Sequence, residues 1–292
     1  MTPNFIRQDD SPLFPAILFN RPVTRGGAGR LLIAGGHTGE LSQPTALFAL
    51  AGAAGAGECL VALPDALLKL LAGTPSTTFV ASSPSGSLGR EALGRLLELS
   101  EDMEAVALGV SLSSNSETAI LIDRFIGETV RPVIAFDEAI TLSLSNPHTL
   151  LKSADNLLVL TMPQVFKLAD QLGVAVQIRP GGGLINKLEI VASVSAQMAA
   201  SMLVYGTEII IAVPGQPLIV TPTDYRLSLY PAAYYALASV FWMQNPARRR
   251  EGLATGAFIL GQISRHIQTD KRFTISDLGR LIKAELETRS GF

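Results

Sequence analysis

Residues Gly29–Pro64, GRLLIAGGHTGELSQPTALFALAGAAGAGECLVALP, indicate the fold of this chain. The apolar run Arg30–Ala34 stops at Gly35-Gly36, helical spacing follows over Leu47–Ala54, and Cys59–Ala62 is again strand-like. A buried strand that ends in glycines before a helix predicts a ligand site at the carboxyl edge of a parallel sheet, because open α/β proteins bind ligands there.

Similar strand-like runs alternate with helical spacing as far as residue 178. The expected strands are 31–34, 59–62, 78–81, 105–109, 133–136, 156–160 and 174–178, and the expected helices are 44–55, 64–72, 88–100, 116–127 and 163–172. This alternation predicts an α/β fold, with a central, mostly parallel sheet flanked by helices on both faces.

The pattern changes after residue 183. It predicts a long helix over 184–203, a hairpin of 208–213 with 217–220, and helices over 227–243, 251–265 and 274–290. The last helix begins at a capping-box sequence, Thr274-Ile275-Ser276-Asp277. Residues 1–28 are expected to be an irregular N-terminal segment. Since no linker composition occurs, residues 1–292 are expected to form a single domain.

The composition sets limits on partners and location. Hydrophobic residues make up 48% and charged residues 16%, which favours apolar surface buried in a homo-oligomer. With no apolar run of 18 residues and no signal-peptide pattern, we expect a cytoplasmic protein without a membrane partner. The net charge of −2 gives no global field for nucleic acid. The basic run Arg248-Arg249-Arg250 is interpreted as a solvated loop.

Few residues suit metal or disulfide chemistry. Cys59 is the one cysteine, so no intrachain disulfide forms. The three histidines, His37, His148 and His266, are far apart in sequence and have no second ligand at metal spacing, so no structural metal is expected.

Four glycine clusters could approach a ligand closely. Gly35–Gly39 follows a strand and precedes a helix, so ligand contact and a plain tight turn both remain open. Gly52–Gly57 follows a helix, which favours helix packing and a glycine cap over a dinucleotide fingerprint. Pro180–Gly183 fits a phosphate loop or a flexible connection, and Pro214–Pro217 fits a turn.

Polar groups follow two of the expected strands. Asp137-Glu138 comes directly after Val133–Phe136, and Thr161 follows another strand. Carboxylates at this edge can bind substrate hydroxyls or transfer protons, and they can equally cap the helix that follows. Both interpretations of the acidic pair stay open.

The order of these segments resembles that of the ADP-dependent NAD(P)H-hydrate dehydratases, relatives of the ribokinase-like kinases. The resemblance is carried by Arg25-Gly26, Gly29-Arg30, LLIAGG (31–36), AGAAGAGECLVALP (51–64), ALGVSLSSN (107–115), PVIAFDEAITL (132–142) and Leu158–Thr161. It implies a ribokinase-like fold, ADP or ATP as cofactor, and a hydrated dinucleotide as substrate. In that family the phosphates lie against a Gly-x-Gly-Asp turn whose aspartate activates the substrate hydroxyl.

The chain departs from the family where that chemistry lies. The family's Gly-Pro-Gly-Leu-Gly loop keeps its first Gly and its Leu here, but Pro, Gly and the last Gly are replaced by Val110, Ser111 and Ser113. The two acids of the family's Asp-Ala-Asp motif are replaced by Phe136 and Glu138. The Pro-His that follows the family's threonine is replaced by Met162-Pro163. The strand 209–212 lacks the family's lysine. Leu229–Ala232 aligns with the Gly-x-Gly-Asp turn but contains neither glycine nor acid. A rival alignment places Leu253–Gly256 there.

The resemblance therefore implies a divergent homologue with weak or absent catalysis. Its matched positions, expected to line a substrate pocket, are Gly36, Gly109, Leu112, Glu138 and Thr161. A non-catalytic nucleotide-binding or oligomeric scaffold protein is the first alternative. A ribokinase-like small-molecule kinase is the second, although such kinases also need the Gly-Asp turn.

Overall fold

The computed structural model describes residues 3–177, 182–267 and 273–290. Ten strands form one sheet: β1 (Phe5–Arg7), β2 (Arg30–Gly35), β3 (Glu58–Pro64), β4 (Thr77–Val80), β5 (Ala105–Val110), β6 (Val133–Phe136), β7 (Leu157–Thr161), β8 (Ser201–Tyr205), β9 (Glu208–Ala212) and β10 (Leu218–Pro222). Their order is β1-β10-β9-β8-β7-β6-β5-β2-β3-β4. Only β9 is antiparallel to its neighbours.

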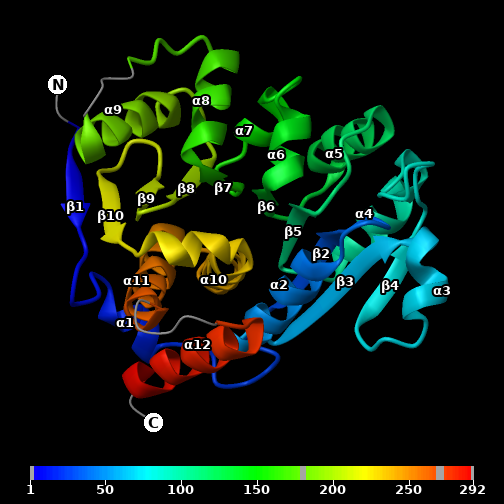
Figure 1. Cartoon of the computed structure of the whole chain (residues 1–292), viewed down its shortest axis with the longest axis horizontal. Helices are drawn as coiled ribbons and strands as arrows, with labels where there is room; N and C mark the ends of the chain where they lie inside the picture. The colour runs from blue at the N-terminus through cyan, green and yellow to red at the C-terminus, as the bar shows by residue number, and fades with distance from the viewer. Residues whose placement is uncertain (1–2, 178–181, 268–272, 291–292) are drawn as a thin grey trace.

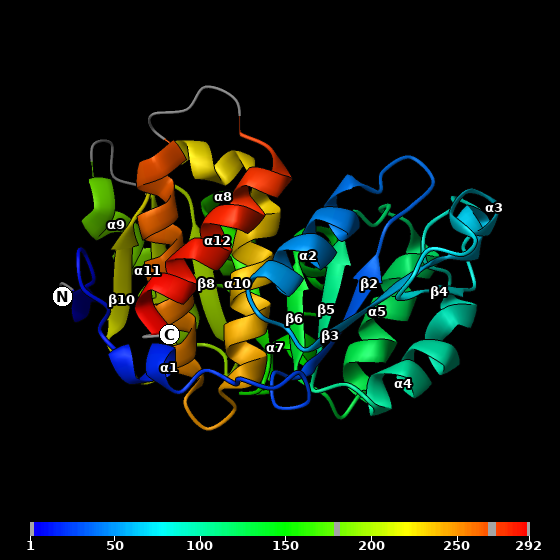
Figure 2. The ribbon, with the colours of Figure 1, turned by 90° about the horizontal axis from the view of Figure 1, so that it is seen from below.

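Helices cover both faces of this sheet (Figure 1), as the view turned by 90° also shows (Figure 2). One face carries α1 (Pro15–Phe19), α2 (Ser42–Ala53), α10 (Pro231–Gln244), α11 (Arg249–Ile267) and α12 (Ile275–Ser290). The other carries α4 (Leu93–Glu101), α5 (Ser116–Glu128), α6 (Asp137–Ser143), α7 (His148–Leu151), α8 (Met162–Gln171) and α9 (Gly183–Ser195). The shorter α3 (Leu68–Leu71) lies near β4, and three 3-10 turns span Asp65–Leu67, Arg90–Ala92 and Tyr225–Leu229. The predicted α/β architecture is confirmed.

The sheet is buried because a separate apolar core packs on each of its faces. All six residues of β5 are buried, as expected for a central parallel strand covered on both sides. The chain proceeds outward from β2 through β3 to β4, then returns to β5 on the other side of β2. The carboxyl ends of β2 and β5 therefore form the topological switch point, where open α/β sheets bind ligands.

The predictions after residue 172 were partly wrong. The helix expected over 184–203 ends at Ser195, and Ser201–Tyr205 forms β8 between β7 and β9. A strand buried on both faces is a continuous apolar run, so its periodicity cannot distinguish it from a buried helix. No strand forms over residues 174–177, and Ile178 lies outside the described residues.

The predicted hairpin is confirmed, since Ile219 of β10 pairs antiparallel with Ile211 of β9. Residues 1–28, expected to be irregular, contain two short elements: β1, which pairs with β10, and α1. The capping box at α12 is also present, because the Thr274 N–H donates to the Asp277 carboxylate at 2.9 Å and the Asp277 N–H donates back to the Thr274 hydroxyl at 3.2 Å.

Candidate functional site

Gly36 lies at the switch point, directly after β2. Its φ of +82° is the left-handed conformation that favours glycine, and its N–H donates to the Val110 carbonyl at 2.8 Å. A Cβ on Gly36 would lie 3.1 Å from a methyl group of Leu63. The backbone at Gly36 thus stays hydrogen-bonded to the end of β5 as the chain turns from β2 towards α2, and the Gly36 N–H already has a protein acceptor.

Gly109 is enclosed by backbone at the end of β5. Its φ is +114°, and a Cβ there would lie 2.4 Å from the Phe136 carbonyl oxygen and 2.4 Å from the Ala139 Cβ. Glycine is therefore required for β5 to pack against the start of α6. The side chain of Leu112 is 3% exposed and belongs to the core on that face. Gly109 and Leu112 both lie next to the carboxyl edge of the sheet. Packing within the protein is enough to explain why glycine and leucine occupy these positions.

Glu138 lies in the first turn of α6, where it meets the loop after β5. Burial raises the pKa of its carboxyl above the ordinary value, and the neighbouring Asp137 carboxylate raises that pKa further. The Leu112 backbone N–H hydrogen-bonds to this carboxyl. Its Oε2 atom is buried, and within the part of the chain that the structure describes it has no hydrogen-bond partner. A partner-free buried carboxylate oxygen can accept a hydrogen bond from a ligand hydroxyl.

Thr161 ends β7 and is the N-cap of α8. Its N–H donates to the Gln164 side-chain oxygen at 2.8 Å, and its hydroxyl lies 3.0 Å from the same oxygen. The bond from the Thr161 N–H to the Gln164 side chain is the one that the third residue of a helix makes to the N-cap in a capping box. The Thr161 hydroxyl therefore already serves α8, and its placement at the carboxyl edge agrees with the prediction.

The edge also contains an aromatic cluster that sequence reasoning missed. Tyr235 of α10 hydrogen-bonds to the Asp137 carboxyl, and the Tyr205 and Tyr235 hydroxyls are 3.1 Å apart. Tyr235 stacks on Phe136 and Tyr205 stacks on Tyr234, each with ring centroids 4.4 Å apart. Burial raises the pKa of Tyr205 to about 12, so these phenols stay protonated at neutral pH. Together they fill the space between α10 and the carboxyl ends of β6 and β8.

Asp137 itself has an unusual backbone. Its φ of +36° is rare outside glycine, asparagine and aspartate, and burial raises the pKa of its carboxyl. Such conformations persist only where the surroundings enforce them. Of the acidic pair, Asp137 contacts the tyrosines, whereas the Oε2 atom of Glu138 has no hydrogen-bond partner among the described residues.

The raised pKa of Asp137 predicts a pH-dependent stability. A carboxyl whose pKa is higher in the folded than in the unfolded state stabilises the fold fully below its unfolded pKa and loses that contribution as pH rises through the folded value. We therefore expect the difference in unfolding free energy between Asp137→Asn and the wild type to shift in favour of the variant from pH 4 to pH 7. Asparagine also tolerates positive φ, and an unperturbed aspartate ionises near pH ~4. Urea melts at both pH values would measure this. A constant difference would contradict it.

The first turn of α10 lies where the family resemblance places the phosphate-binding turn. Pro231 is its N1 residue, and proline has no N–H to offer an anion. Tyr230 is the N-cap and makes no side-chain cap; its hydroxyl donates to the Phe273 carbonyl at 2.9 Å. The rival segment Leu253–Gly256 lies inside α11, which begins at Arg249.

A serine-rich loop after β4 also approaches the switch point. The Ser85 hydroxyl is 2.9 Å from that of Ser113, and the Asn115 amide donates to both hydroxyls at 3.0 Å. The Thr38 N–H donates to the Gly86 carbonyl at 3.1 Å, which ties this loop to the turn after β2. The hydroxyl groups at the edge thus form a network within the protein.

The other glycine clusters have structural settings. The backbone between α2 and β3 is tight, since a Cβ on Gly57 would lie 1.9 Å from the Arg25 carbonyl oxygen. Gly215 adopts φ +75° in the turn between β9 and β10. Gly182 is the N-cap of α9, while Pro180 and Gly181 lie outside the described residues.

Two kinds of feature are absent from the described residues. Over 3–177, 182–267 and 273–290 no group of three His, Cys, Asp or Glu side chains could hold a metal ion. In the same ranges no helix combines the length and apolar character needed to cross a bilayer.

No family model matches this chain. Its sequence is similar to the bifunctional NAD(P)H-hydrate repair enzyme of Moorella thermoacetica, with 29% identity over 203 residues, which is 68% of this chain and 37% of that enzyme. The chain thus matches little more than a third of that curated relative. The similarity agrees with the predicted resemblance to the NAD(P)H-hydrate dehydratases.

Solved structures show the same fold. A ribokinase-like superfamily protein of Enterococcus faecalis superposes with a TM-score of 0.72 at 14% identity, covering 97% of this chain and 96% of the other. The ADP/ATP-dependent NAD(P)H-hydrate dehydratase of Bacillus subtilis, co-crystallised with ATP and Mg²⁺, gives 0.65 at 16% identity, covering 95% and 96%. Ribokinase of Cryptococcus neoformans with ADP gives 0.56 at 12%, covering 88% and 99%. The ribokinase-like fold is confirmed.

Proposed function

We propose that this chain is a divergent homologue of the ADP/ATP-dependent NAD(P)H-hydrate dehydratases that has weak or absent dehydratase activity and binds a nucleotide-type small molecule at the carboxyl edge. The observation that carries the loss of activity is the first turn of α10, where Pro231 stands at N1 and Leu229–Ala232 contains neither glycine nor acid. The sequence similarity to an NAD(P)H-hydrate repair enzyme supports the ancestry.

The chemistry of the edge supports the loss of catalysis. A glycine turn holds phosphate through several converging backbone N–H groups, and bulky residues with a proline do not reproduce them. This helix start therefore lacks the converging N–H groups with which the family's turn holds the phosphates of ADP or ATP. Without the acid of that turn, proton transfer loses about two to four orders of magnitude in rate. Asp137 does not replace it, because its carboxyl is buried against Tyr235.

The environment of Glu138 supports the proposal that the carboxyl edge still binds a ligand. Its buried Oε2 atom has no partner among the described residues, and a ribose hydroxyl would satisfy it. The remaining matched positions, Gly36, Gly109, Leu112 and Thr161, would then form the wall of this site through their backbone and packing, with Glu138 as the polar contact.

A non-catalytic oligomeric scaffold is the second candidate. Large apolar side chains are exposed on this chain, including Leu70 at 72% and Val130 at 86%, and a second copy could cover them. Light scattering that gives a monomer mass would remove this candidate. A ribokinase-like kinase ranks behind both, because it needs the same missing turn.

Thermal melts with ADP, ATP, NADH and NADPH would test the ligand site. We expect a saturable rise in Tm with at least one of the four, because a ligand that binds only the folded state stabilises it. Glu138→Gln should reduce the rise. The matched control Glu98→Gln, at an exposed carboxylate on α4, should leave it unchanged. No response to any of the four would refute the retained site.

A further inference from the structure

The sheet has an open edge at β4. Among the described strands β4 is the last in the sheet order, so it pairs only with β3, and it lies at the outer end of the sheet beside α3 (Figure 1, Figure 2). The Val61 N–H of β3 donates to the Ser76 carbonyl at 2.9 Å, and Val61 pairs with Thr77. Because successive residues of a strand direct their N–H and C=O groups to opposite sides, those of Thr77 and Phe79 point away from β3, where the described residues place no further strand.

This edge lacks the features that usually protect a terminal strand. Natural proteins guard such edges with charged side chains, above all lysine, with proline, or with a covering helix or loop. The strand β4 reads Thr-Thr-Phe-Val, and none of the 20 residues from Leu70 to Gly89 is charged. The loop that follows returns only beyond the strand, where the Gly89 N–H donates to the Ala81 carbonyl at 2.9 Å. The backbone groups of Thr77 and Phe79 therefore lie along an uncharged edge.

Apolar side chains are exposed next to this edge. Leu68 and Leu70 of α3 are 47% and 72% exposed, although leucine is among the residues most often buried. Between α2, α3 and β4 lies an apolar groove of about 180 Å³, whose lining includes Phe48, Leu71 and Pro75. Phe48 and Leu71 pack against the core on the α2 side of the sheet, so the groove and α3 lie on that face. Exposed leucines and an apolar hollow thus adjoin the open strand.

The size and charge of this surface suit a second copy of the same surface. All of residues 65–79 except Leu67 are exposed or half-buried, and α2 adds Thr45 and Phe48 across the groove. We call these residues the β4 surface. It approaches the about 20 residues a side that a standard interface needs. Its charged residues are Asp65 and Lys69, one of each sign, so two copies meet without net like-charge repulsion.

We propose that the β4 surface binds a second copy of this chain, with the two β4 strands antiparallel about a two-fold axis at Thr78. The outward N–H and C=O groups of Thr77 and Phe79 in each copy then bond to the other copy, and Thr78 faces its counterpart as a non-hydrogen-bonded pair. The axis is normal to the joined sheet, so both α3 helices stay on one face, where their exposed leucines leave water. A two-fold interface uses the same patch on both subunits. The ligand proposed for the carboxyl edge is not involved.

Sedimentation velocity of the full chain tests the dimer. At about 10–100 µM protein, above the micromolar dissociation constants of weak standard-size interfaces, we expect a mass of twice 30.9 kDa. Leu70→Lys and Thr77→Lys should each weaken association by about 10-fold or more, because the two-fold axis brings both copies of the new charge into one interface. The control Val130→Lys, at a side chain that is 86% exposed next to β6, should remain dimeric.

Disulfide trapping tests the register. A non-hydrogen-bonded pair has Cα atoms about 4.5 Å apart, within the range that a disulfide bridges. Thr78→Cys should therefore give a disulfide-linked dimer on mild oxidation with copper phenanthroline, whereas Val130→Cys should not. The native Cys59 is buried, and burial raises the pKa of its thiol to about 12, so it does not compete.

Two results would overturn the proposal. One is a wild-type monomer over the whole concentration range. The other is a dimer that Leu70→Lys and Thr77→Lys leave intact and that Thr78→Cys does not trap, which would leave the scaffold candidate standing with a different interface. If Thr77→Lys fails to fold, Leu70→Lys, at an exposed position, and Thr78→Cys carry the comparison. Neither result bears on the thermal melts with nucleotides, which test the carboxyl edge alone.

Discussion

Replacing Gly109 by alanine is expected to lower the unfolding free energy by about 3 kcal/mol or more, a sum of backbone strain and overpacking. The residue has φ +114°, and a Cβ would lie 2.4 Å from the Phe136 carbonyl oxygen, so β5 or α6 must shift. Urea denaturation of the purified variant measures the loss.

Gly94→Ala is the matched control for this substitution. Gly94 lies on the exposed side of α4, and a Cβ there would meet no atom within 4 Å. Alanine in a helix is favoured over glycine by up to about 1 kcal/mol, so this variant should be slightly more stable than the wild type. A Gly109→Ala protein as stable as the wild type would show that the end of β5 is not packed as described.

Tyr235→Ala is expected to cost about 3–5 kcal/mol, as large aromatic truncations in cores do. The ring is fully buried, stacks on Phe136, and places its hydroxyl between Tyr205 and Asp137. Removing it leaves a cavity and also takes away the donor to a buried carboxyl. Thermal and urea denaturation would both show the loss.

Tyr235→Phe separates the two contributions. It keeps the ring and removes the hydroxyl, and a buried polar group left without a partner costs about 1–3 kcal/mol. Tyr225→Ala, at a tyrosine that is 58% exposed, should change stability by less than about 0.5 kcal/mol. If Tyr235→Ala were no more destabilising than Tyr225→Ala, the aromatic cluster would not be part of the core.

The sequence predicted most of the sheet because its central strands have a local signal. The run Leu31–Ala34 is apolar, bounded by glycines, and long enough for a buried strand but not for a helix. The same reasoning failed at Ser201–Tyr205, which follows the apolar α9 after only a few residues. This segment is a strand because it pairs with β7 and β9, and pairing with distant strands does not change the local periodicity of the sequence.

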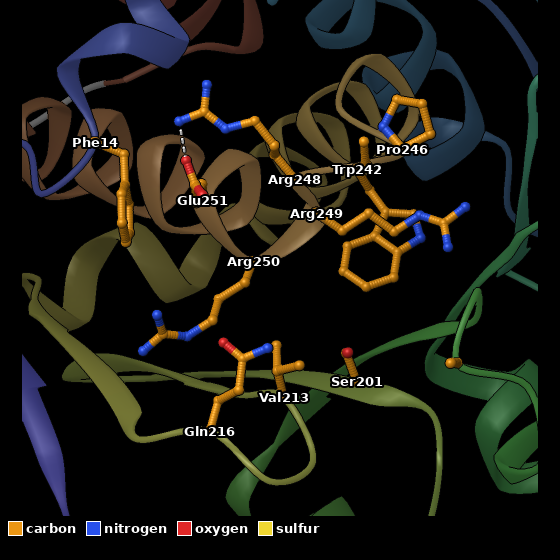
Figure 3. Close-up of a pocket in the computed structure, with 12 residues that line it drawn as sticks. Phe14, Ser201, Val213, Gln216, Trp242, Pro246, Arg248, Arg249, Arg250 and Glu251 are labelled. Carbon is orange, nitrogen blue, oxygen red and sulfur yellow. Dashed lines mark hydrogen bonds and ion pairs between the residues drawn. The ribbon is translucent and has the colours of Figure 1, made fainter.

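The location of the candidate site was predictable from the sequence, but the contacts between its side chains were not. Asp137-Glu138 and Thr161 lie at the carboxyl edge because each follows a parallel strand. The partnership of Asp137 with Tyr235 joins residues 98 positions apart, and Tyr205 meets Tyr235 over 30 positions. Contacts between residues so far apart in the sequence produce no local sequence pattern from which they could be predicted. The interpretation of Arg248–Arg250 as a solvated loop was wrong for Arg249 and Arg250, which are half-buried at the start of α11 (Figure 3), because a run of arginines has the same sequence in a loop and at a helix start.

The most direct test is the rate at which this chain restores NADH from hydrated NADH in the presence of ADP, compared with a dehydratase that keeps the Gly-x-Gly-Asp turn. Without the acid of that turn, we expect a rate lower by about a hundredfold or more, or no turnover. Turnover equal to that of the intact dehydratase would contradict the proposal and would require another acid at the carboxyl edge to perform the proton transfer.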